Sequence, residues 1–293
     1  MDASDPAVEL VVRQYQDLMK AHFDRWEVRR KREPDQEKEE LRVSRSLEVL
    51  GLASEVDDFM QQIFPGTPPN DVTFEQFLEA YLISMRDDVH QCLTPEQVAF
   101  LGNVHLRFLT TGLANAQCVN ADVSGQPLSY FLTFINEGLY FALNQLFTGL
   151  IFEELQGDLA EYRRDGTDAF EAAIRLYLEP HSTNIEAVPL ELGDDEATGE
   201  VQAHLSSVTT IVLLFVSLHE FAHAWLGHHA FIEASHLAMA NGTGFEAVQL
   251  EPNPAAWTLE FEADDFAFRA LMSRTKSLES HWAHAFILYL FFS

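Results

Sequence analysis

The chain has 293 residues, 47% hydrophobic and 22% charged, so it is long and apolar enough to fold around a substantial core. Its net charge of −28 is unevenly spread: residues 1–45 hold 11 acids and 10 bases, and the other 248 hold 35 acids and 8 bases. Nucleic-acid binding depends on Lys and Arg at phosphates, so we expect no nucleic-acid partner.

Several features of the sequence argue against a secreted or membrane protein. The first ten residues, MDASDPAVEL, lack the basic and apolar segments of a secretory signal. Cys92 and Cys118 are the only cysteines and lack CxxC spacing, which fits a reducing compartment. The longest purely apolar runs are too short for a clear membrane span. We therefore expect a cytoplasmic protein without a membrane partner.

The N-terminal part of the chain is highly charged and has helical periodicity. Apolar residues recur at helical spacing on both sides of Pro34, which predicts two helices meeting near this proline. The basic tract at residues 29–32 has acidic neighbours, so it is better explained as a solvated helix face than as a recognition patch. We expect a charged helical region over residues 1–65. The charge change at residue 45 suggests the hypothesis that this region binds a regulatory partner.

Proline, glycine and asparagine interrupt the chain at residues 64–77, and we place the start of the main domain, residues 66–293, there. The pattern from residue 73 to 178 predicts helices, with a capping box at Thr94 and Gln97. Residues 128–154 are expected to form buried helices. The acidic segment 181–200 is rich in helix breakers and is expected to be an exposed loop. The predicted fold class is mainly α, with little or no β structure.

A central buried helix is predicted at residues 208–226, because this stretch is apolar almost all round. Ser206 or Ser207 can cap its start, and Gly227 can end it. The predicted length is about 30 Å.

This helix contains the sequence HEFAH, residues 219–223. His219 and His223 stand one turn apart on one face, so their imidazoles can bind one metal ion. Glu220 lies about 100° further around the helix, where its carboxylate can act as a catalytic base beside the open coordination position. Chance alone gives HExxH in about one such sequence in twenty, so the motif needs support.

A second helix, predicted at residues 257–272, gives this support. Glu260 and Asp264 share one of its faces. Glu260 can be a third, carboxylate ligand, while Asp264 accepts the outer N–H of His219 and fixes its tautomer. Together these residues predict a zinc site with one Zn²⁺ per chain.

The pair of segments HEFAH and EFEADDFA resembles the HExxH and ExxAD motifs of gluzincin-type zinc metallopeptidases, most closely the CAAX prenyl endopeptidases and their bacterial HtpX-type relatives. This resemblance covers about 55 residues, and it implies zinc ligands at His219, His223 and Glu260 with Glu220 as catalytic base. Those relatives cross the membrane several times. The stretch HEFAHAWLGH is also similar to the phage-exclusion Lit-type peptidases, which implies a protein substrate and a triggered, defensive role.

Two other ligand schemes remain open at this point. Glu262 could replace Glu260, but Phe266 would then stand where the supporting acid is needed. His229 could be the third ligand, as in metzincins, although the turn glycine of that pattern is displaced by one position, to Gly227. Candidate donors to the transition state are, first, His281 and His284, and then Arg269 and Tyr289.

The sequence therefore predicts a zinc-dependent endopeptidase that hydrolyses peptide bonds in a protein substrate by metal-activated water. The acidic body favours a substrate with a basic segment. The alternative is a helical interaction module whose metal site is inactive or structural. Structural zinc sites are usually closed by four ligands and rich in cysteine, whereas three candidates and no nearby thiol are found here.

Overall fold

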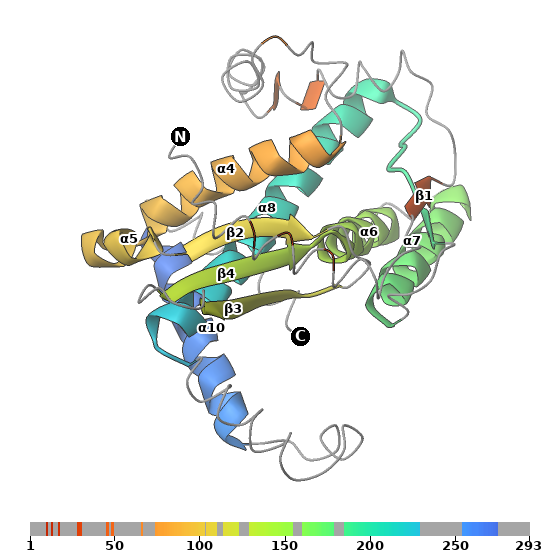
Figure 1. The fold of residues 1–293 in the computed structure, drawn as a ribbon. Coiled ribbons are helices and arrows are strands. Elements are labelled where there is room, and N and C mark those ends of the chain that lie inside the picture. The colour runs from red at the N-terminus through yellow and green to blue at the C-terminus, as the bar shows by residue number, and fades with distance from the viewer. Residues whose placement is uncertain are drawn as a thin grey trace.

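The computed structural model describes residues 74–102, 104–109, 114–122, 129–154, 160–178, 185–228 and 254–274, together with residues 10, 13, 17, 28–30, 45, 46, 48, 49 and 66. Within this part the chain is mainly helical, as predicted, with one small three-stranded sheet (Figure 1).

The elements follow one another in a mixed order. They are β1 (Val28–Arg30), α4 (Phe74–Cys92), α5 (Pro95–Leu101), β2 (Val104–Leu109), β3 (Ala116–Asp122), β4 (Ser129–Asn136), α6 (Glu137–Glu154), α7 (Ala160–Leu178), β5 (Ile185–Ala187), α8 (Asp195–Trp225) and α10 (Pro254–Arg274). The capping box predicted at the start of α5 is confirmed, because the side chain and backbone of Thr94 bond reciprocally to those of Gln97.

The three-stranded sheet has the order β2-β4-β3, with β2 parallel and β3 antiparallel to the central strand β4. These strands lie within residues 73–178, so the prediction of helices throughout that region is wrong. In β2, buried Val104 and Leu106 alternate with less buried neighbours, as in a half-covered strand. The central strand is continuously buried from Leu132 to Asn136, as expected of a strand covered on both faces.

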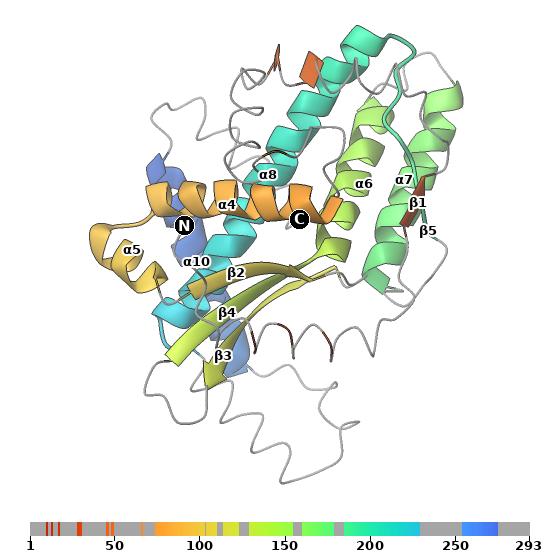
Figure 2. The same cartoon turned by 45° about the horizontal axis from the view of Figure 1, so that its top comes forward.

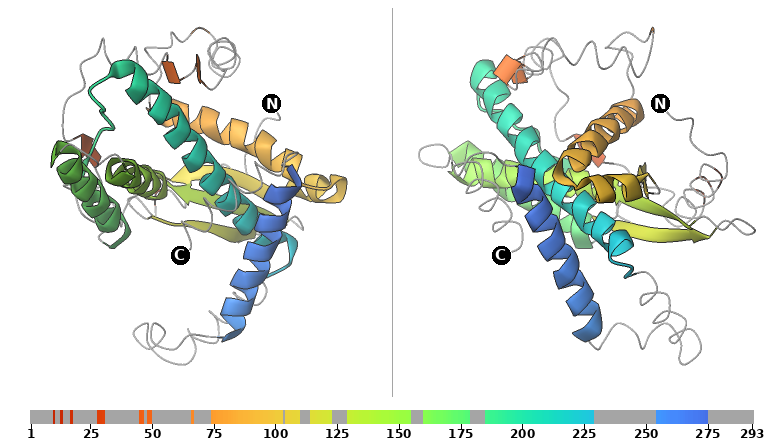
Figure 3. Two further views of the ribbon diagram at one scale, coloured as in Figure 1. Left: turned by 180° about the vertical axis from the view of Figure 1, so that it is seen from behind. Right: turned by 90° about the vertical axis from the view of Figure 1, so that its left-hand side faces the viewer.

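Helix α8 is the centre of the molecule. It contacts β3, β4, α4, α6 and α10, and in the view from behind it crosses the sheet while α10 crosses its C-terminal end (Figures 2 and 3). Its core side chains are fully or almost fully buried: Val212, Leu213, Leu214, Phe215, Leu218 and Phe221. Of the described helices, α8 alone is long and apolar enough to cross a membrane. Core helices of proteins share that length and composition.

Helix α8 begins at Asp195, about three turns earlier than predicted. The residue that caps its start is Asp194, whose Oδ1 accepts hydrogen bonds from the N–H groups of Glu196 and Ala197. Ser207 does not cap the helix, because its hydroxyl donates to the carbonyl of Ala203 one turn earlier.

The prediction of an exposed loop over residues 181–200 is therefore wrong. Residues 195–200 belong to α8, and residues 185–190 include buried Ile185, Val188 and Leu190. The buried side chain of Gln145 on α6 pairs with both backbone groups of Val188, at 2.7 and 3.2 Å. This pairing replaces the water that an exposed loop would use.

The N-terminal region contacts the main domain at two described places. Strand β1 pairs in parallel with β5, so residues 28–30 are not helical as predicted. Pairing with a distant segment has overridden the local periodicity. Arg45 forms ion pairs with Glu196 and Glu200 at 3.1 and 2.8 Å, and the hydroxyl of Ser46 donates to the carbonyl of Gly199.

Candidate metal centre

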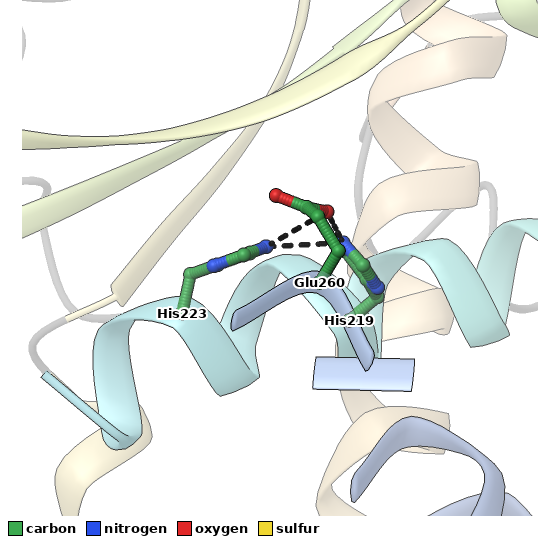
Figure 4. A group of neighbouring side chains, drawn as sticks. All are labelled: His219, His223 and Glu260. Carbon is green, nitrogen blue, oxygen red and sulfur yellow. Dashed lines mark hydrogen bonds and ion pairs between the residues drawn. The ribbon is translucent and has the colours of Figure 1, made fainter. Parts of the chain in front are cut away.

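Helices α8 and α10 cross where three potential metal ligands meet. His219 and His223 lie one turn apart on α8, and Glu260 reaches them from α10 (Figure 4). The two Nε2 atoms are 3.0 Å apart, and Glu260 Oε2 lies 3.1 Å from His219 Nε2 and 3.6 Å from His223 Nε2. All three donor atoms therefore face one common point.

These spacings fit a zinc ion. In a tetrahedral site with ligands at about 2.0–2.1 Å, neighbouring donor atoms are about 3.3–3.4 Å apart. The three observed distances, from 3.0 to 3.6 Å, lie on both sides of that value. Two imidazole nitrogens and one carboxylate oxygen are also a donor set that zinc accepts.

Asp264 lies one turn beyond Glu260 on α10 and contacts His219 from behind. Its Oδ1 is 2.8 Å from His219 Nδ1, so the ring can donate this N–H to the carboxylate and direct the lone pair of Nε2 toward the common point. Burial lowers the pKa of His219, but hydrogen bonds to Asp264 and Glu260 outweigh it and raise this pKa to about 9. The same contacts act on Glu260, whose pKa falls well below its usual range because of its hydrogen bonds to His219 and His223.

His223 has a different outer partner, His228, from the turn that follows α8. The Nδ1 atom of buried His228 lies 3.0 Å from His223 Nδ1, and His228 Nε2 lies 3.2 Å from Glu262 Oε2. Burial and the neighbouring His223 lower the pKa of His228, although Glu262 opposes this shift. The available signal was the position of His228, immediately after the glycine that ends the helix.

Glu220 is buried between α8 and the sheet, with 9% of its surface exposed. Burial raises the pKa of its carboxyl group, against the opposing effects of His219, of His223 and of the backbone N–H of Cys118 on β3. A carboxyl group with a raised pKa beside a metal site is suited to taking up and releasing a proton.

The structure separates the other candidates. Glu262 lies outside the ligand group and faces His228. Arg269 is not brought to the site, because it is exposed on α10 and paired with Asp265 at 2.9 Å. The remaining candidates lie outside the described residues: His229, His281, His284 and Tyr289.

Comparison of the chain with family models, curated proteins and solved structures finds no match. The resemblance to gluzincin-type peptidases therefore remains an expectation based on the two motifs. The geometry of the candidate metal centre has to support a function by itself.

Proposed function

We propose that the protein is a zinc-dependent peptidase whose metal is held by His219, His223 and Glu260. The observation that carries this proposal is the convergence of their donor atoms, which lie 3.0 to 3.6 Å from one another. These atoms come from two helices whose ligands are about forty residues apart in the sequence and meet in space. A zinc ion bound there supplies Lewis acidity, which activates a water molecule and polarises a carbonyl group.

Glu220 is the proposed catalytic base. It follows the first ligand directly on α8, and the N–H of Cys118 holds its carboxylate at the edge of the sheet. A carboxylate in this place can accept the proton of the attacking water and deliver it to the leaving amine. Its buried position favours uptake of the proton, because burial makes the charged carboxylate less stable relative to the protonated form.

The number of ligands favours catalysis over a purely structural role. Three protein donors converge, and the described residues provide no fourth His, Cys, Asp or Glu donor in this group. Structural zinc sites are usually closed by four protein ligands, whereas catalytic sites use three and leave one position for water or substrate.

The neighbouring edge of the sheet favours a peptide as the substrate. Among the described strands, β3 pairs only with β4, and on its other edge the N–H of Cys118 points at Glu220. An extended peptide can add to such an edge through main-chain hydrogen bonds. The excess of acids over bases outside residues 1–45, 35 against 8, favours a basic segment in that peptide. The proposal includes a cytoplasmic location.

The first test is zinc content, measured by mass spectrometry on protein purified without a histidine tag or added metal. We expect about one zinc per chain. A chain that holds no zinc, even after zinc is supplied, would refute the proposal.

The second test compares Glu220→Gln with the wild type on fluorescein-labelled casein. Cleavage should fall by about 10²–10⁴-fold while zinc is retained, because the substitution removes the base and no ligand. Glu200→Gln, the same change at an exposed position of α8, is the control and should cleave normally. Equal cleavage by Glu220→Gln would exclude Glu220 as the base.

A further inference from the structure

We infer that His228 and Glu262 are positioning residues that hold the metal ligand His223 in its binding orientation. The inference rests on the proposed metal site and assigns a role to two residues outside the HExxH and ExxAD motifs. In the proposed arrangement, His223 donates a hydrogen bond to His228, and His228 donates one to Glu262 on α10.

The backbone at the end of α8 places His228 against His223. Gly227 has a φ of 75°, a left-handed conformation that glycine adopts without strain. The N–H of Gly227 donates to the carbonyl of Ala224 at 3.3 Å, and the N–H of His228 donates to the carbonyl of His223 at 3.0 Å. These two bonds form a Schellman motif, which brings the second residue after the C-cap residue Leu226 back over the last turn. In this chain that second residue is a histidine, and it lies over a metal ligand.

The hydrogen bonds between the side chains allow a consistent assignment of protons. If His223 Nε2 binds the metal through its lone pair, the single proton of the neutral ring is on Nδ1. That N–H donates to Nδ1 of His228 at 3.0 Å. His228 then carries its proton on Nε2 and donates it to Glu262 Oε2 at 3.2 Å. In this chain of contacts each ring nitrogen is a metal ligand, a hydrogen-bond donor or a hydrogen-bond acceptor.

Burial makes this chain of contacts important for the orientation of the ring. The side chains of His223 and His228 are 7% and 4% exposed, so little water can replace either partner. Glu262, at 57% exposed, ends the chain at the surface. His219 is oriented by Asp264 directly, and His223 is oriented through His228, so α10 supplies the terminal carboxylate for both ligands.

The test measures zinc affinity by competition with a chromophoric chelator. His228→Ala should bind zinc about 10–100-fold more weakly than the wild type, the usual effect of losing an outer partner. His228→Asn should retain most of the affinity, because its side-chain oxygen can accept the Nδ1–H of His223. His204→Ala, which changes an exposed histidine of the same helix, is the control and should bind as the wild type does.

Two further measurements separate positioning from packing. The visible absorption of the Co²⁺-loaded protein should change in His228→Ala and return toward the wild-type spectrum in His228→Asn. Glu262→Ala leaves the buried residues intact and should weaken zinc binding about threefold or more, against no change in Asp265→Asn on the same helix.

The outcomes distinguish this inference from the proposed function. A wild-type chain that binds no zinc overturns both. A wild type that binds zinc, with His228→Ala and Glu262→Ala equally tight, overturns the positioning role alone. Equal weakening in His228→Ala and His228→Asn also overturns it, because the hydrogen bond would then not be what matters. Unfolding of the metal-free variants in urea shows whether they are folded, and Glu262→Ala decides the matter if His228→Ala is not.

Discussion

Zinc binding should depend steeply on pH because His219 must lose a proton before its Nε2 can bind metal. Its pKa is raised to about 9 by Asp264 and Glu260. At pH 7.0 about 1% of the rings are therefore unprotonated, and at pH 8.5 about a quarter are. The apparent association constant should rise about 20-fold over this interval, close to tenfold for each pH unit at its lower end.

The assay is chelator competition at fixed total zinc, in buffers that do not bind the metal, between pH 6.0 and 8.5. Asp264→Asn keeps the shape of the side chain and removes the charge beside His219, so its affinity should rise much less over the same interval. Asp265→Asn removes the neighbouring charge, which faces Arg269, and should keep the wild-type slope. A wild-type affinity that is flat from pH 7.0 to 8.5 would refute this account of His219.

The remaining predictions concern stability. In the metal-free chain, the raised pKa of His219 stabilises the fold fully below pH 6.5, and this contribution should disappear as the pH rises through about 9, which urea unfolding with a chelator present would show. Gly149→Ala should destabilise by about 1–3 kcal/mol, because its Cβ would lie 3.0 Å from the Phe170 ring, and Phe170→Leu in the same chain should recover part of the loss. Phe221→Ala should cost about 3–5 kcal/mol, against a small effect of Phe268→Ala at an exposed position; equal unfolding midpoints for these two variants would contradict the assigned core.

Much of the helical framework could be predicted from local patterns. The capping box at Thr94 and the glycine after α8 are short-range signals, and both act as predicted. The alternation of apolar and polar residues in VHLRFL, the segment of β2, also indicates a strand, although helices were predicted there. By contrast, the central strand β4 has no regular alternation of apolar and polar residues and is continuously buried from Leu132 to Asn136, and periodicity does not distinguish such a segment from a buried helix.

The early start of α8 and the β1-β5 pair depend on contacts that local patterns do not contain. Residues 185–190 are mostly apolar, but they lie in the segment 181–200, whose acids and helix breakers predict a loop. Gln145 satisfies the backbone at Val188 and allows burial. The strand at residues 28–30 exists through a partner more than 150 residues away. Local propensity gives no information about such a partner.

Glu260 and Glu262 lie on different sides of α10, and this decides which of them can be a metal ligand. Residues two apart on a helix project about 200° from each other, so both glutamates cannot reach one metal ion from α10. The sequence favoured Glu260 because Asp264 lies on its face, and the structure brings these two residues to His219. Glu262 lies toward the other side of α10, where the chain after α8 turns back at Gly227 and presents His228. The spacing on one helix therefore predicts the ligand, whereas the use of the second glutamate depends on a turn in another segment.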